Sequence, residues 1–121
     1  MSGKYNAARN AFAEKRLSWT QDRILAQLLS AEYRFREDHS PDDLTGTVGE
    51  PIELSGKEVD DGWLFAATLK FEQVRGPEVL AIVFYSDSLL IEYHNEIENF
   101  PMFPNGGDIE VSILRPGIVR I

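Results

Sequence analysis

Apolar side chains in the first 36 residues recur at helical spacing. From residue 5 to residue 17 they fall about once per turn, which predicts a helix. Ser18 and Gln21 have the spacing of a capping box, and the apolar stripe beyond them predicts further helix. The members of this stripe are Ile24, Leu28, Ala31 and Phe35. The two stretches form either a helical hairpin broken near Ser18 or one long helix. Residues 40–43 then combine a cap, a proline and two acids, which predicts one short helical turn.

Beyond residue 47 the apolar period changes to two, as in β-strands. Residues 48–54, interrupted by Gly49 and Pro51, have the pattern of an edge strand. Residues 63–71 predict one long strand with alternate apolar positions on one face. The run 79–85 is apolar on both faces, which is typical of a central strand covered on both sides. Further strands are predicted at 89–94, 109–113 and 118–121, with a loop at 99–108.

These elements predict an α+β fold in a single domain spanning residues 1–121. An N-terminal helix or helical hairpin, within a helical segment at 1–44, packs on one face of a curved antiparallel β-meander of about five to six strands at 45–121. The second face of the central strand must also be covered, because its apolar side chains cannot all remain in water. Three arrangements achieve this: the sheet curls around a ligand cavity, it forms a homodimer through its open face, or the 100–103 loop covers it.

Charge divides the chain into two unequal parts. Residues 1–36 hold seven basic and three acidic residues, a net +4, whereas residues 37–121 hold five basic and seventeen acidic residues, a net −12. The acidic part attracts basic proteins and repels nucleic acid, so direct nucleic-acid binding is not expected. The basic side chains of the first part are expected to be solvated or to pair with the acidic body.

The composition excludes several kinds of chemistry. Without cysteine the chain has no disulfide, thiolate nucleophile or sulfur-based zinc site. No phosphate-binding loop, dinucleotide fingerprint or serine-hydrolase motif occurs, so no cofactor and no catalytic residue are predicted, which favours a non-enzymatic function. The first residues lack the apolar core of a signal peptide and no run is long enough to cross a membrane, so we expect a cytoplasmic protein, in the host cytoplasm if it is encoded by a virus.

One strand end carries residue types found in metal and acid–base sites. A strand at 92–96 would place Glu92, His94 and Glu96 on one face. A metal ion would require further ligands, and the other histidine, His39, falls in a polar turn. We therefore interpret this segment as a solvated strand end, with no metal site.

The segment 99–107 places two phenylalanines and a methionine between prolines, outside any regular period. Prolines stiffen a loop, and aromatic residues and methionine are enriched at interface cores, so this segment is a candidate partner contact. The alternative is a lid that plugs one end of the sheet. With the acids that flank it, the predicted partner-binding set is Glu92, Glu96, Glu98, Phe100, Met102, Phe103, Asp108 and Glu110.

The function favoured by these features is a non-enzymatic acidic binding or inhibitor protein that masks a basic protein partner. Immunity proteins and phage anti-defence proteins that mimic nucleic acid follow this logic. An alternative is a small-molecule-binding protein or enzyme with a cavity between helices and a curved sheet, an architecture that resembles the NTF2-like cone. That resemblance implies Glu92 or His94 as a base, and as cavity residues Trp63, Phe65, Tyr85, Tyr93 and His94. A further alternative is a phage structural or assembly protein.

Overall fold

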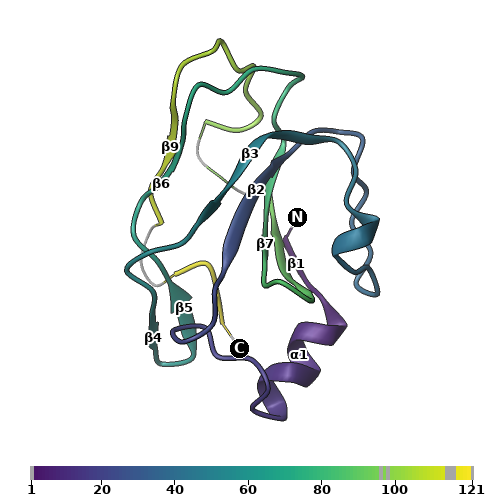
Figure 1. The fold of residues 1–121 in the computed structure, drawn as a ribbon, viewed down its shortest axis with the longest axis vertical. Helices are drawn as coiled ribbons and strands as arrows, with labels where there is room; N and C mark the ends of the chain where they lie inside the picture. The colour runs from purple at the N-terminus through teal and green to yellow at the C-terminus, as the bar shows by residue number, and fades with distance from the viewer. Residues whose placement is uncertain (1, 96, 98, 114–116, 121) are drawn as a thin grey trace.

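The computed structural model describes residues 2–95, 97, 99–113 and 117–120 and has a mainly-β fold (Figure 1). One five-stranded antiparallel sheet has the strand order β1-β8-β7-β2-β3, and two small sheets have the orders β10-β5-β4 and β6-β9. The strands of the large sheet are β1 (Ser2–Lys4), β8 (Leu90–His94), β7 (Ala81–Tyr85), β2 (Leu25–Leu29) and β3 (Thr47–Glu53). Those of the small sheets are β10 (Val119–Arg120), β5 (Trp63–Phe65), β4 (Glu58–Asp60), β6 (Leu69–Phe71) and β9 (Ile109–Val111). The helices are α1 (Asn6–Ala13) and a 3-10 turn, η1 (Pro41–Asp43).

The predicted first helix is confirmed as α1, but the predicted second helix is wrong. Residues 25–29 form β2, which pairs with β3 on one side and with β7 on the other. Core side chains cover both faces of β2, with Ala26 and Leu28 in one cluster and Leu29 in the other, so residues 26–29 are all buried. In a strand that is apolar on both faces, apolar residues also occur three and four positions apart, as they do in a helix. This explains why the apolar pattern of residues 24–35 predicts a helix.

The sheet is not the predicted meander, and residues 1–44 are not a helical segment. β1 pairs with β8, and β2 sits between β3 and β7, so strands from the first 30 residues are built into a sheet with strands from far along the chain. With α1 as the single α-helix among the described residues, the arrangement also departs from the NTF2-like cone. No helix in those residues is long and apolar enough to cross a membrane.

The predicted long strand at 63–71 is wrong as well. It is divided into β5, which belongs to the sheet with β4 and β10, and β6, which pairs with β9. The buried positions change phase between the two, from Leu64 and Ala66 to Leu69 and Phe71. Other predictions are confirmed: β3 is an edge strand and β7 is a central strand. Ser40 is the N-cap residue of η1, and the Asp43 side chain accepts a hydrogen bond from the Ser40 backbone N–H at 2.8 Å.

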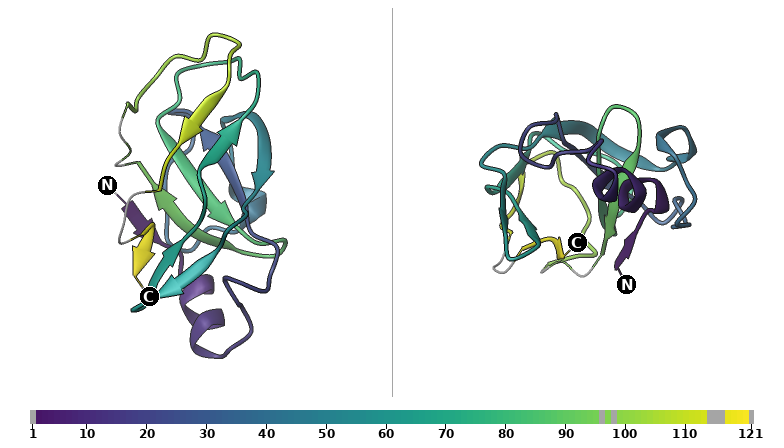
Figure 2. Two further views of the ribbon diagram at one scale, coloured as in Figure 1. Left: turned by 90° about the vertical axis from the view of Figure 1, so that its left-hand side faces the viewer. Right: turned by 90° about the horizontal axis from the view of Figure 1, so that it is seen from below.

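The large sheet is buried on both faces by two different parts of the chain. The main core lies between this sheet, α1 and the two small sheets, and it contains Ile82 and Phe84 of β7. The opposite face, with Ala81 and Val83, packs under aromatic side chains from the segment that carries η1, seen on the far side of the sheet from β5 and β6 in Figures 1 and 2. Since the chain itself covers this face, a cavity, a dimer or the 100–103 loop is not needed to bury it.

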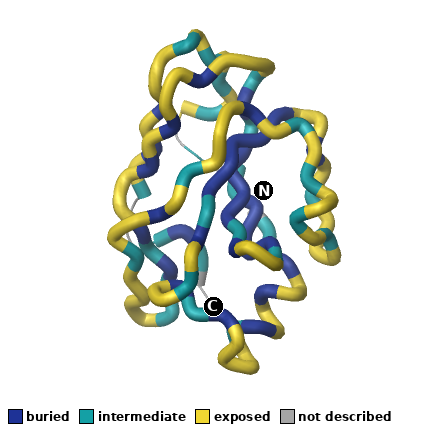
Figure 3. Tube along the Cα trace, viewed as in Figure 1, coloured by how far each residue is buried: buried dark blue, intermediate teal, exposed yellow. Residues whose placement is uncertain are grey.

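Exposure follows the same division. Figure 3 shows the buried trace concentrated in β2 and its neighbours, with exposed residues in the outer loops and in the segment around η1. Two large apolar side chains among the described residues are exposed, Val59 in β4 and Phe103 in the 99–107 loop.

Candidate functional site

Glu92 is the most unusual polar residue of the described chain. It lies in β8 opposite Phe84, with 2% of its surface exposed. The β7–β8 register shifts next to Tyr85, and beyond this shift Ile91 and Glu92 both line a space under α1. The expectation of a solvated strand end is therefore wrong for Glu92, which is not available as a surface rim residue.

The carboxyl group of Glu92 is held in an environment that disfavours its charge. Its Oε2 atom is buried and has no hydrogen-bond partner. Burial raises the pKa of Glu92 from 4.5 to about 8, against the opposing effect of the positive charges on Lys4 and Arg9. At neutral pH the carboxyl group is therefore mostly protonated and can donate a hydrogen bond.

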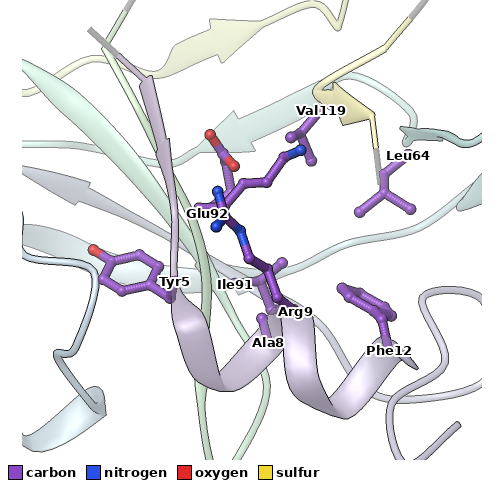
Figure 4. Close-up of a pocket in the computed structure, with 9 residues that line it drawn as sticks. Tyr5, Ala8, Arg9, Phe12, Leu64, Ile91, Glu92 and Val119 are labelled. Atoms are coloured by element: carbon purple, nitrogen blue, oxygen red, sulfur yellow. The ribbon is translucent and has the colours of Figure 1, made fainter. Parts of the chain in front are cut away.

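Glu92 lies at the boundary between an apolar cavity and a wider cleft. The cavity has a volume of about 200 Å³, and the cleft, about 430 Å³, is lined in addition by Gly3, Phe35 and Glu37. Figure 4 shows Arg9 extending from α1 toward Glu92, with the apolar side chains around them. The residues that line the cavity are Lys4, Tyr5, Ala8, Arg9, Phe12, Leu64, Ile91, Glu92 and Val119. Those shared with the cleft are Lys4, Arg9, Glu92 and Val119.

The 99–107 loop is attached to the body on both sides of Phe103. Met102 and Val79 exchange two backbone hydrogen bonds, of 2.7 and 3.0 Å, and the Gly106 N–H donates to the Val74 carbonyl at 2.8 Å. Phe100 and Met102 are partly buried against the main core. Phe103 is 74% exposed. Two of the apolar residues of the loop therefore pack against the core, whereas the third, Phe103, projects into solvent.

Of the acids predicted to flank this loop, those that the structure describes lie beside other residues of the chain. Asp108 Oδ1 accepts a hydrogen bond from the Gln73 backbone N–H at 3.0 Å, and its Oδ2 lies 3.5 Å from Lys70 Nζ. Glu110 is paired across the strands with the same Lys70 and is exposed. Glu96 and Glu98 lie outside the described residues.

The predicted cavity residues are not brought together. Trp63 and Phe65 are half-buried in β5 on either side of Leu64, which does line the cavity. Tyr85 and Tyr93 belong to the aromatic cluster on the opposite face of the sheet. His94 is half-buried at the end of β8, opposite Ser2 of β1. Of the residues named for chemistry from the sequence, Glu92 alone lines the cavity. The remaining lining comes from α1, β1, β5, β8 and β10 and from Tyr5, which directly precedes α1.

A chain of hydroxyl and imidazole groups on the opposite face was not predicted. The Tyr5 and Tyr33 hydroxyls lie 2.7 Å apart, and the Tyr33 hydroxyl lies 2.9 Å from His39 Nδ1. Burial is the main cause that raises the pKa of both tyrosines, so their hydroxyls stay protonated at neutral pH. Within the described ranges, no three histidine, aspartate or glutamate residues are grouped so as to hold a metal ion.

Comparisons with protein-family models, with curated protein sequences and with solved structures found no match to this chain. Its function is therefore inferred from the geometry described above.

Proposed function

We propose that this chain is a non-enzymatic acidic protein-binding domain that docks its 99–107 loop on a basic protein partner. The observation that carries the proposal is Phe103, a large apolar side chain that is 74% exposed on a loop fixed by hydrogen bonds at Met102 and Gly106. A loop whose backbone is already fixed loses little conformational freedom on binding, and aromatic residues are enriched at the centres of interfaces.

The net charge of −8 supports a basic partner. Long-range attraction between opposite charges accelerates encounter and contributes less to the lifetime of the complex. Lys70 lies beside Asp108 and Glu110, and the Arg75 guanidinium group packs against Gly106. We therefore expect the attraction to come from the acidic surface as a whole, with Phe103 providing the local contact.

The test is capture of partners from a lysate of the organism that encodes the chain, with three immobilised proteins compared side by side. These are the wild type, Phe103→Ser, and Val59→Ser as a matched control, because Val59 is the other large apolar residue that is exposed in the described part of the chain, at 51%. A basic partner that binds wild type and Val59→Ser, is lost with Phe103→Ser and is released by salt would support the proposal. Loss of an interface anchor of this kind costs 2 kcal/mol or more, roughly 30-fold in affinity.

Equal capture by all three proteins, or release that ignores ionic strength, would overturn the proposal. An assembly role, in which the chain binds copies of itself, gives a different result: light scattering on the purified protein would show an oligomer that Phe103→Ser disrupts, with no basic partner captured. Glu110→Lys addresses the charge separately, because reversing an exposed acid should slow association with the captured partner while changing its dissociation little.

A further inference from the structure

The cavity beside Glu92 has the features of a ligand site. Neither the charge of the chain nor the proposed role of the 99–107 loop accounts for these features. Glu92 is 98% buried, yet its Oε2 atom has no hydrogen-bond partner, and a buried polar atom of this kind costs free energy unless something binds it. The atom belongs to a side chain that lines both an apolar cavity and an open cleft. We propose that this cavity binds a small apolar monocarboxylate, with the carboxylate at Glu92 and the hydrocarbon tail between α1 and β5.

The lining determines the orientation of such a ligand. Ala8, Phe12 and Leu64 line only the apolar cavity, and they suit a hydrocarbon tail. Lys4 and Arg9 line both spaces and therefore stand where the tail region meets the cleft. The carboxylate of the ligand would lie at this boundary, where the cleft admits solvent.

Charge selects a carboxylate over an amine. With Glu92 protonated, the charged groups that face it are the Lys4 ammonium and the Arg9 guanidinium and, across the cleft, the exposed Glu37 carboxylate. The Tyr5 hydroxyl is directed away from Glu92, toward Tyr33 on the opposite face of the sheet. A ligand ammonium would be repelled by two cations close to Glu92. A ligand carboxylate would be attracted by both and would accept the proton of Glu92 in a hydrogen bond.

The volume sets the size of the ligand. A cavity of about 200 Å³ is smaller than the roughly 300 Å³ at which sites for drug-sized ligands begin. It therefore suits an aliphatic chain of about six carbons or a single aromatic ring, and the affinity expected for a ligand of this size is modest, with a Kd on the order of 1 mM.

The experiment is an NMR titration of the ¹⁵N-labelled full chain with hexanoate, hexanol and hexylamine at pH 6.5. We expect hexanoate to bind most tightly and to shift the amide signals of Ala8, Phe12 and Ile91, which line the cavity. Between pH 7 and pH 9 hexanoate affinity should fall about tenfold, because Glu92 loses the proton that it donates. Hexanol affinity should change little over the same range.

Three variants make the test specific. Glu92→Gln keeps a neutral donor at every pH, so it should retain hexanoate binding and lose the decrease between pH 7 and pH 9. Ala8→Leu fills the cavity and should abolish binding of hexanoate and hexanol alike. Arg9→Gln, at an exposed position, should weaken hexanoate and leave hexanol unchanged. Tighter binding of hexylamine than of hexanoate, no shift at the cavity amides, or hexanoate binding that Ala8→Leu preserves would each overturn the proposal. Because the cavity and the 99–107 loop share no residue, the ligand-binding proposal and the partner-binding proposal can each fail without the other.

Discussion

The Tyr5 hydroxyl lies 2.7 Å from the Tyr33 hydroxyl, a buried hydrogen bond between residues 28 positions apart in the sequence. Tyr5 directly precedes α1, whereas Tyr33 belongs to the segment between β2 and η1. The rings of Phe35 and Tyr93 stack beside this pair with centroids 5.5 Å apart. The hydrogen bond therefore ties the start of the helix to the segment that closes the second face of the sheet.

Because of this bond, removing the two hydroxyls one at a time should lower the free energy of unfolding by different amounts. Tyr33→Phe leaves the fully buried Tyr5 hydroxyl without this partner and should lower the free energy of unfolding by about 1–3 kcal/mol. Tyr5→Phe should cost less, about 1 kcal/mol, because Tyr33 keeps its contact with His39 Nδ1. Urea unfolding of both variants and of the double variant measures the coupling. If the double variant equalled the sum of the two single effects, the hydroxyls would not be energetically coupled.

The elements that were predicted correctly are those whose pattern is set locally. The cap at Ser40 and the two-sided apolar run of β7 depend on neighbouring residues alone, and both are confirmed. β2 could not be predicted in this way, because its strand character comes from pairing with β3 and β7, which lie some 20 and 55 residues farther along the chain. Its apolar positions, read without those partners, fit a helix as well as a strand.

The candidate site shows the same limit. A nearby histidine and other acids single out Glu92 in the sequence, but its burial depends on the β7–β8 register shift and on α1 and β10, which lie over it. No residue near Glu92 in the sequence signals that Leu64 and Val119 line the same cavity. In contrast, the prolines and aromatic residues that distinguish the 99–107 loop are local features of the sequence.

Gln27 is a buried polar residue whose side chain replaces missing strand pairing. The β2–β3 register shifts between Ala26 and Leu28, and the Gln27 side-chain amide donates to the carbonyl oxygens of Val48 at 3.0 Å and Gly49 at 3.1 Å. Gln27→Leu should lower the free energy of unfolding by about 1–3 kcal/mol, because these carbonyls lose a donor in the interior. Urea unfolding at neutral pH measures this. A loss below about 0.5 kcal/mol would mean that water reaches the carbonyls instead.

Replacing the exposed phenylalanine of the 99–107 loop should affect stability far less than replacing a buried one. Phe103→Ser should change the free energy of unfolding by less than about 0.5 kcal/mol, since the side chain is 74% exposed. Phe71→Ala, in the main core at 1% exposure, should cost about 3–5 kcal/mol. Thermal and urea unfolding of the two variants make the comparison. If Phe103→Ser were as destabilising as a core substitution, Phe103 would be buried in solution and would not be available to a partner.

Glu92 should make the stability of the chain depend on pH in a defined direction. Its pKa is about 8 in the folded state and 4.5 in a solvated chain, so between these values the folded state holds a proton that the unfolded state has released. Stability from this group is therefore fully present below about pH 4.5 and decreases as pH rises toward 8, with no further decrease above that. The slope is at most about 1.4 kcal/mol per pH unit.

Glu92→Gln isolates this contribution from the rest of the acidic surface. The amide cannot ionise, so the difference in unfolding free energy between the wild type and Glu92→Gln should shift steadily against the wild type from pH 5 to pH 8. Urea unfolding of both proteins at each pH gives this difference, in which the repulsion among the other acids largely cancels. A difference that stays constant across this range would mean that Glu92 ionises as readily in the folded chain as in water. In that case, its carboxyl group would be reached by solvent rather than held neutral under α1.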